Sequence, residues 1–214
     1  RNPLKVANQK LIDESKLLQI ARHERIPDYI WEGETTNLKG EKVRVLVQEY
    51  IEGSDLHQTV QNVAQMKSNI SLERAIEIML QICETLEHLA QFEVPIYHCD
   101  LKPANVIIHP QRGAVLIDFG IARQSKTGRH YTTVAGGSMP WTPTELDDKE
   151  IGPFTDVYSL GQLFYHLLTQ KRPPAVLAEA QKELILAGGH PEWASNLVLQ
   201  AGHHQRETRL QSVT

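Results

Sequence analysis

Two long segments of this chain carry apolar residues at helical spacing, and only short strand-like runs lie between them. After Ser71, a candidate N-cap, apolar residues recur three or four positions apart, which predicts one buried face of a helix about five turns long. These residues are Leu72, Ile76, Met79, Cys83, Leu86 and Ala90. A second apolar stripe over residues 157–168 predicts another buried helix. Two short runs, 106–108 and 114–117, flank a turn and predict a small hairpin.

The composition is that of a globular chain without a basic surplus. Its 214 residues include 22 Lys and Arg against 26 Asp and Glu, a formal net charge of −4. This balance disfavours a protein that holds nucleic acid or anionic lipid through charge. No uncharged apolar run approaches the roughly 18 residues that a membrane span requires. Cys83 and Cys99 are too few and too far apart for a disulfide framework or a zinc site. We therefore expect a soluble protein in a reducing compartment, the cytoplasm.

The first fifty residues mix strand-like and helical patterns. Residues 3–7 are short and apolar with one lysine and predict a strand, whereas residues 12–21 have helical spacing. Residues 29–32 and 43–50, joined by a polar stretch, predict two antiparallel strands. The order is a small strand-and-helix part followed by a larger, mostly helical part.

Residues 98–105 have the sequence His-Cys-Asp-Leu-Lys-Pro-Ala-Asn and lie between the long helix and the predicted hairpin. Thirteen residues after Asn105 comes Asp-Phe-Gly, at 118–120. Both motifs resemble the protein-kinase superfamily, in its catalytic loop and its metal-binding turn. A chance match at seven positions, at about one in twenty each, is on the order of one in a billion per register. Cys99 replaces the arginine that many members carry before the catalytic aspartate.

The resemblance implies phosphoryl transfer, a reaction that asks the protein mainly to position charge. Asp100 is expected to accept or orient the proton of the substrate hydroxyl, and Lys102 to neutralise charge on the moving phosphoryl group. Asn105 and Asp118 offer oxygen ligands for Mg²⁺, a hard cation that prefers carboxylate and amide oxygens together with phosphate. The structural alternative for Asp100 and Asp118 is a loop carboxylate that caps a helix or a turn.

Residues 47–53 are similar to the segment that joins the two lobes of a kinase, where the base of ATP binds backbone groups. By this resemblance Gln48 lies at the back of the nucleotide pocket, and Glu49 and Ile51 give main-chain contacts to adenine. Asp55 is placed for the ribose. Gln48 is polar where many members of the family have an apolar residue.

The residues expected to hold the ATP phosphates depart from the family pattern. Glu14 has the place of the regulatory-helix glutamate, and Lys5 has the place of the lysine that pairs with it and with the phosphates. Only nine positions separate them, and a strand end, a loop and about two helical turns must fit in that gap. Either the connection is unusually short, or residues between Ala7 and Ile12 are missing, or Lys10 or no lysine takes this role. The glycine-rich loop G-x-G-x-x-G does not occur in the chain.

Downstream motifs extend the resemblance. Residues 143–145 are Pro-Thr-Glu where the family has Ala-Pro-Glu, and Arg209 has the place of the arginine that pairs with Glu145 in a structural ion pair. Residues 156–161, Asp-Val-Tyr-Ser-Leu-Gly, are similar to the start of a helix in the family. This similarity makes Asp156 a brace for the backbone of the catalytic loop.

The resemblance implies an α+β, bilobal protein-kinase-like fold. A truncated, β-rich N-terminal lobe takes residues 1–49 and a mainly helical C-terminal lobe takes residues 50–214. The leading hypothesis is a serine/threonine protein kinase that moves the γ-phosphoryl group of ATP, with Mg²⁺, to a protein hydroxyl. The alternatives are a pseudokinase that acts as a nucleotide-binding or allosteric module, and a small-molecule phosphotransferase of the aminoglycoside type. The expected partners are ATP and a protein substrate, and the chain resembles a catalytic domain of a longer, bacterial signalling protein.

Overall fold

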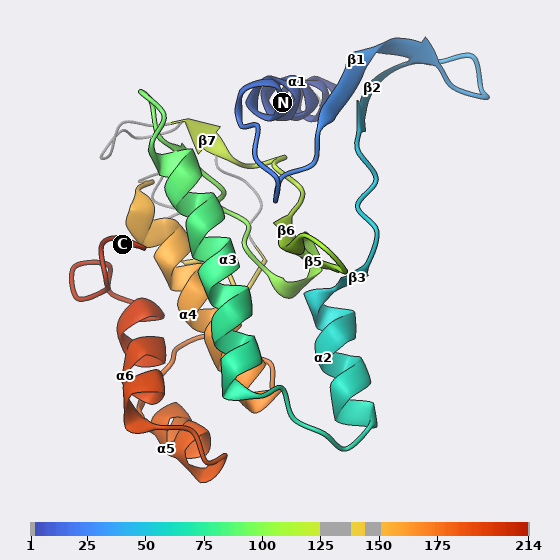
Figure 1. Cartoon of the computed structure of the whole chain (residues 1–214). Helices are drawn as coiled ribbons and strands as arrows, with labels where there is room; N and C mark the ends of the chain where they lie inside the picture. Colours follow the sequence, from blue (N-terminus) through green and yellow to red (C-terminus); the bar gives the residue numbers. More distant parts are fainter. Residues whose placement is uncertain (1–2, 125–137, 144–150, 214) are drawn as a thin grey trace.

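The computed structural model describes residues 3–124, 138–143 and 151–213. The elements are, in order, α1 (Pro3–Ile20), β1 (Tyr29–Thr36), β2 (Lys42–Gln48), β3 (Ser54–Asp55), α2 (Leu56–Gln65), α3 (Leu72–Ala90), β4 (Ile96–Tyr97), η1 (Pro103–Asn105), β5 (Val106–His109), β6 (Gly113–Leu116), β7 (Arg123–Gln124), α4 (Pro153–Thr169), α5 (Glu179–Ala187) and α6 (Glu192–Ala201). Figure 1 shows α1 and the β1–β2 hairpin above a larger, mostly helical part. The expected α+β architecture is therefore confirmed. In these ranges no helix is both long and apolar enough to cross a membrane.

Helix α1 begins earlier than the sequence predicts. The strand expected over residues 3–7 is wrong, because these residues form the first turns of α1. Pro3 suits the start of a helix, where its missing N–H has no partner to lose. Lys5 and Glu14 therefore lie nine residues apart on one helix, separated by about 13 Å of rise and half a turn. The Lys5–Glu14 pair stays a prediction, and Lys10 lies one turn before Glu14 on the same face of the helix.

The two strands expected near residues 29 and 43 form the β1–β2 hairpin, with antiparallel pairing. The Asn37 side-chain oxygen accepts hydrogen bonds from the backbone N–H groups of Lys39 and Glu41, at 2.9 and 3.0 Å. Gly40 has a φ of 79°, a conformation that glycine takes without steric cost. Among the described strands, β1 and β2 pair only with each other, and the hairpin projects from the body (Figure 1).

A second sheet has the strand order β3-β5-β6 and confirms the hairpin expected over residues 106–117. Gly113 closes its turn with a φ of 74°, and a Cβ there would lie 2.3 Å from the Gln81 side chain. Helix α2 follows β3 directly, and the sequence patterns did not predict it. Asp55 is its N-cap, since the carboxylate accepts a hydrogen bond from the Gln58 N–H at 2.7 Å.

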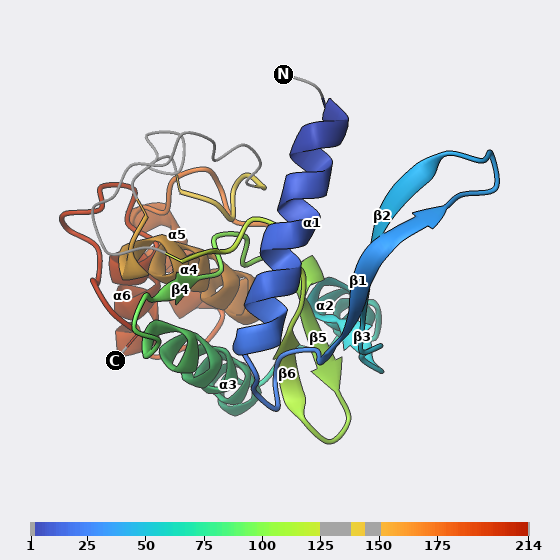
Figure 2. The ribbon, with the colours of Figure 1, turned by 90° about the horizontal axis from the view of Figure 1, so that it is seen from above.

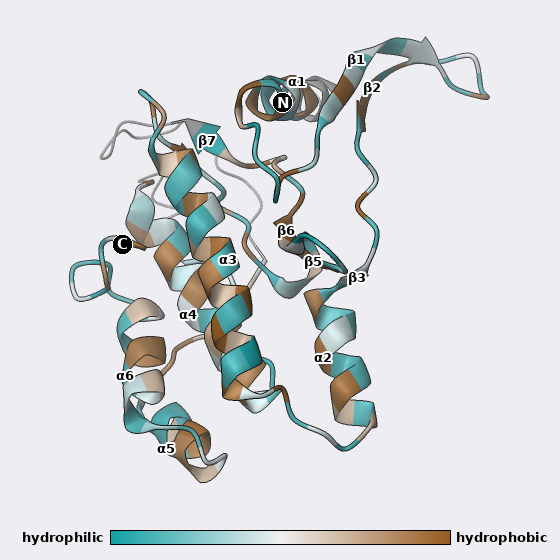
Figure 3. Cartoon of the chain, in the orientation of Figure 1, coloured by the Kyte–Doolittle hydropathy of each residue, from teal (hydrophilic) through white to brown (hydrophobic). Residues whose placement is uncertain are grey.

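Helices α3 and α4 form the centre of the core. Ser71 caps α3 as predicted, because its hydroxyl accepts a hydrogen bond from the Arg74 N–H at 3.2 Å. The predicted buried stripe is wrong by about one position: Ile76, Met79 and Cys83 are only partly buried. The fully buried face instead consists of Ala75, Ile78, Ile82 and Leu89 with Leu86. The predicted apolar helix is α4, which is buried from Phe154 to Leu168, and Figure 3 shows hydrophobic bands on both helices.

Helix α1 packs onto the helical part through its last turns. Leu17, Leu18 and Ala21 are buried in the same cluster as Ile82 and Leu86 of α3. Figure 2 shows α1 lying across the body when the molecule is seen from above. The small and large parts of the chain thus share one continuous core. The boundary between residues 49 and 50 stays a prediction.

Candidate active site

The loop of residues 98–105 lies between β4 and β5, and a buried carboxylate of α4 fixes its start. Asp156 accepts hydrogen bonds from the backbone N–H groups of His98 and Cys99, both at 2.8 Å. Burial raises the pKa of Asp156, while the nearby His98 ring and these two N–H groups oppose that rise. Asp156 therefore braces the backbone of this loop, as the sequence predicts. Cys99 has a φ of 65°, an uncommon conformation for a residue other than glycine.

Within this loop, one ammonium group joins the catalytic motif to the segment of residues 138–143. The Lys102 Nζ lies 2.5 Å from Asp100 Oδ2 and 3.0 Å from the Ser138 hydroxyl. The Asn105 amide donates to the same Asp100 oxygen at 3.1 Å. Asp100 Oδ1 is buried without a hydrogen-bond partner among the described residues. One carboxylate oxygen of Asp100 is thus fixed by two hydrogen bonds, and the other has no hydrogen-bond partner in the described part of the chain.

The β5–β6 hairpin brings the second motif beside the first. The Ile117 N–H donates to the Asn105 carbonyl at 3.0 Å, so Asp118 follows directly after a residue bonded to the catalytic loop. Asp118 is exposed, with a φ of 63°, and its Oδ1 accepts from the Gly120 N–H at 3.2 Å. The structure therefore gathers Asp100, Asn105 and the Asp118 turn at one end of the hairpin.

Glu14 reaches this turn from α1. Burial and the negative charge of Asp118 raise the pKa of Glu14, while a hydrogen bond from the Phe119 backbone N–H lowers it. A Cβ at Gly120 would lie 3.1 Å from Asp118 Oδ1 and 3.5 Å from Glu14 Oε2. The two carboxylates therefore flank one glycine, and a cation there would relieve their repulsion.

The donor set fits Mg²⁺ bound together with phosphate. Asp118 supplies an exposed carboxylate, and Asn105 uses its NH₂ group for Asp100, which leaves the amide oxygen as the ligand. In the described ranges no three His, Cys, Asp or Glu side chains gather as a metal site. One or two protein ligands are enough for Mg²⁺, because this cation keeps several bound waters and also binds phosphate oxygens.

The segment expected to bind the adenine base connects β2 to β3. The Glu49 carboxylate accepts from Arg112 Nη1 at 2.6 Å, and its backbone N–H donates to the Asp28 carbonyl at 2.8 Å. The Glu49 carbonyl is thus the group left for an adenine contact. Gln48 ends β2 and is half-buried, and Ile51 is buried. Their nucleotide roles, and that of Asp55 at the start of α2, stay predictions.

Sequence reasoning missed the residue that positions Ser138. The Ser138 N–H donates to the Thr142 hydroxyl at 2.8 Å, and no motif pointed to Thr142. Glu145, expected to pair with Arg209, lies outside the described residues. The Arg209 side chain is buried and donates to the carbonyls of Phe154 and His203, both at 2.8 Å.

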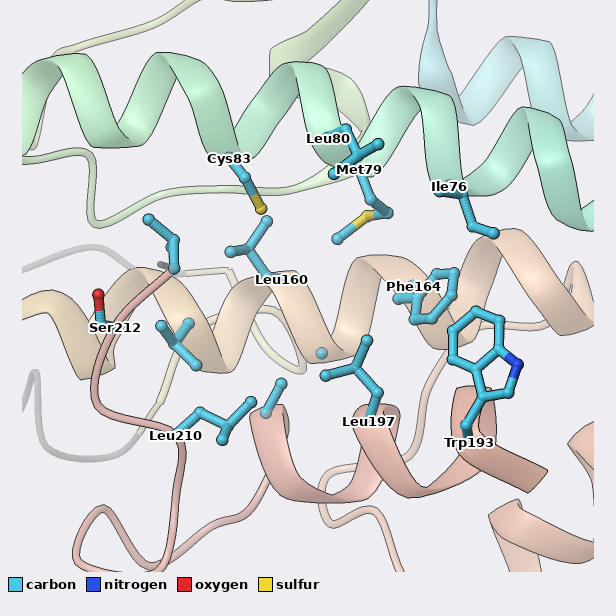
Figure 4. Close-up of a pocket in the computed structure, with 14 residues that line it drawn as sticks. Ile76, Met79, Leu80, Cys83, Leu160, Phe164, Trp193, Leu197, Leu210 and Ser212 are labelled. Atoms are coloured by element: carbon cyan, nitrogen blue, oxygen red, sulfur yellow. The ribbon is translucent and has the colours of Figure 1, made fainter. Parts of the chain in front are cut away.

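A largely apolar cavity of about 280 Å³ lies apart from these residues, between α3, α4, α6 and the C-terminal stretch (Figure 4). Met79 and Cys83 line one side of it, and Trp193 and Leu197 line another. None of the predicted site residues lines it. The candidate active site is therefore the region around Asp100.

Comparison with known proteins supports the same region. A family model described as protein kinase domain matches residues 2–192. The serine/threonine-protein kinase PknB of Mycolicibacterium smegmatis is 33% identical over 132 residues, which cover 60% of this chain and 20% of that protein. The LysM domain receptor-like kinase 10 of Oryza sativa subsp. japonica is 30% identical over 142 residues, 64% of this chain and 23% of that protein.

The human serine/threonine-protein kinase Nek10 is 29% identical over 128 residues, 60% of this chain and 11% of that protein. The chain thus spans less than a quarter of the length of these curated relatives. The family match includes the catalytic loop, the Asp-Phe-Gly turn and α4 in one range. The chain therefore belongs to the protein kinase domain family.

Proposed function

We propose that the protein is a serine/threonine protein kinase, which transfers the γ-phosphoryl group of ATP to a hydroxyl group of a protein substrate. The observation that carries this proposal is the position of Lys102, between the Asp100 carboxylate and the Ser138 hydroxyl. A cation at this point lies beside both the candidate proton acceptor and the segment 138–143. Such a position suits a group that stabilises charge on a phosphoryl group in transfer.

Each of the four side chains has its own role in the proposed transfer. Asp100 Oδ2 is fixed by Lys102 and Asn105, and the unpartnered Oδ1 accepts the proton of the substrate hydroxyl. Lys102 remains close enough to stabilise negative charge as the new bond to phosphorus forms. The Asn105 amide oxygen and the Asp118 carboxylate would hold Mg²⁺, which supplies neutralisation of the nucleotide phosphates when bound.

A nucleotide-binding module without transfer is the second candidate. It is favoured by the course of α1, which places Lys5 and Glu14 nine residues and about half a helical turn apart. The lysine that would hold the ATP phosphates is therefore not assigned. A small-molecule phosphotransferase is less well supported, because the Lys102–Ser138 contact joins the loop to a segment suited to a protein substrate.

The test compares the unchanged protein with the variant Asp100→Asn, in the presence of Mg²⁺ and ATP. Transfer to a generic protein, or to the protein itself, should fall by at least about 100-fold, the lower range for loss of a general base. Asp28→Asn, the same chemical change at an exposed position, is the matched control. ATP binding without any transfer would support the second candidate, and transfer to an aminoglycoside alone would support the third.

A further inference from the structure

Three segments meet beside the candidate active site. The Arg172 guanidinium, just after α4, donates to the Met139 carbonyl at 2.8 Å. The His166 ring of α4 has its centre 5.5 Å from that of Trp141 and 6.4 Å from that of His57 in α2. Helix α2, residues 138–143 and the end of α4 therefore form one continuous surface.

This surface is basic in a chain whose formal net charge is −4. Residues 56–70, 138–143 and 166–178 contain no Asp or Glu. His57, Lys171 and Arg172 are exposed, and these three residues are called the basic face below. An anionic partner is the occupant that complements such a surface.

One side of α4 lies beneath this surface and contains buried polar side chains. The Ser159 hydroxyl donates to the Trp141 carbonyl at 2.8 Å, which shows that this side of α4 contacts residues 138–143. Gln162 and His166 follow at three and seven positions along the helix, on the same side. His166 Nδ1 donates to the Lys171 carbonyl at 2.8 Å. In the described part of the chain, His166 Nε2 and both amide atoms of Gln162 are buried without a partner, so they belong to the support of this surface and not to its exposed face.

We propose that the basic face selects substrates whose phosphorylated Ser or Thr is flanked by acidic residues. The inference rests on the proposed kinase function. Lys102 joins Ser138 to Asp100, so a peptide hydroxyl at Asp100 has its flanking residues next to segment 138–143 and the basic face. Arg172 uses one N–H for the Met139 carbonyl, and its remaining donors suit a carboxylate.

The test uses two serine peptides that differ only in their flanking residues, Asp and Glu in one and Lys in the other. The acidic peptide should have a kcat/KM at least about tenfold higher, the effect of two or three surface charge pairs. Lys171→Glu should reduce this preference by about threefold or more, because it replaces an attraction by a repulsion. Lys39→Glu, the same charge change at the exposed tip of the β1–β2 hairpin, should leave it unchanged.

A binding measurement separates this inference from the kinase proposal. Fluorescence anisotropy of the labelled peptides with the Asp100→Asn variant reports the preference without any transfer. Tighter binding of the acidic peptide, weakened by salt and by Lys171→Glu, supports the basic face even where no transfer occurs. The proposed role of the basic face would be overturned by equal binding of both peptides or by a preference for the lysine peptide. Equal effects of Lys171→Glu and Lys39→Glu would also overturn it. Transfer that survives Asp100→Asn would contradict the kinase mechanism alone.

Discussion

Cys99 shows how one replacement changes the environment of a catalytic loop. The side chain is fully buried and packs in a small cluster with Tyr97, Ile121 and Ile151. Its thiol donates to the Tyr97 carbonyl at 3.5 Å. Where an arginine would carry a positive charge, this chain has a neutral, packed side chain.

Both cysteines should be unreactive in the folded protein. Burial raises the pKa of Cys83 to about 11, and burial together with the Asp156 charge raises the pKa of Cys99 well above its usual range. Because the thiolate is the reactive form, a disulfide reagent at pH 7.5 should label both residues only after denaturation. The variants Cys83→Ser and Cys99→Ser each remove one thiol and so show which cysteine a given labelling signal comes from. Rapid labelling of either thiol before unfolding would contradict this expectation.

Much of the candidate site was predictable because its residues lie in motifs of fixed spacing. Asn105 and Asp118 lie at the same end of a tight hairpin that joins them, and the strand pattern predicted that hairpin. The contact between Glu14 and the Asp118 turn was not predictable from spacing alone, since it depends on how α1 packs. The role of Thr142 at Ser138 depends on the local path of a loop, which no periodic pattern encodes.

At the scale of elements, the β5–β6 turn joins two separate segments through one arginine. Arg112 Nη1 donates to the Glu49 carboxylate at 2.6 Å, and Nη2 donates to the Ile26 carbonyl at 3.3 Å. Arg112 Nε donates to the Glu24 carbonyl. The turn of the β5–β6 hairpin thus fixes both the loop after α1 and the segment proposed to bind adenine.

Arg112→Ala should loosen this connection. Loss of a charged donor with three partners should lower the free energy of unfolding by about 1–3 kcal/mol. ATP should also bind more weakly, because Glu49 loses a contact that positions its backbone. Thermal unfolding and calorimetric titration with ATP measure the two effects. Arg74→Ala, which removes an exposed ion pair with Glu77, is the control, and equal effects of both variants would contradict the proposed role of Arg112.

The elements that sequence patterns missed have physical explanations. Residues 3–7 are a short apolar run, which periodicity alone cannot assign to a strand or a helix. The stripe of α3 was placed one position away, because Ile78 and Ile82 alternate with Ile76 and Cys83 and both faces look apolar. Packing against α1 and α4 decided which face is buried. Helix α2 carried a signal, since Leu56 and Val60 are one turn apart and both buried.

At the scale of the whole molecule, a pair of histidines lies where the small part meets α3. The His23 and His88 ring centres are 4.9 Å apart. Burial lowers the pKa of His23, and the nearby His88 and Arg25 add to this, while Glu24 and Glu84 oppose it. The folded protein therefore disfavours the protonated form of His23.

The folded state should lose stability as the pH falls below about 6.5, the ordinary histidine pKa, because the unfolded chain then binds more protons. Burial also lowers the pKa of His166, which adds to the effect. His23→Gln should reduce the loss between pH 7.5 and 5.5, measured by urea unfolding, by only about a few tenths of a kcal/mol, because His23 is partly exposed and solvent screens its charge. His204→Gln, at an exposed position, is the control. A loss of stability that is the same in His23→Gln as in the unchanged protein would contradict this assignment.

Helix α1 contacts the Asp118 turn through Glu14, so the stability of this contact depends on the charges of Glu14 and Asp118. Glu14 has a raised pKa because of burial and the Asp118 charge, so its ionised form costs stability at neutral pH when no cation is bound. Glu14→Gln keeps an acceptor for the Phe119 N–H and removes the repulsion. Without divalent cations at pH 7, this variant should be about 1 kcal/mol more stable than the unchanged protein, a rise in Tm of about 2–4 °C for a chain of this size.

The sign of this effect depends on pH. A carboxyl group whose folded-state pKa is raised destabilises the fold at a pH above its ordinary value, and the penalty disappears as protonation proceeds at lower pH. The difference between Glu14→Gln and the unchanged protein should therefore shrink from pH 7 towards pH 4.5. Glu93→Gln, at an exposed position, is the matched control. A lower Tm for Glu14→Gln at pH 7 would show that Glu14 is already paired with a cation of the chain, and that α1 docks through attraction and not against repulsion.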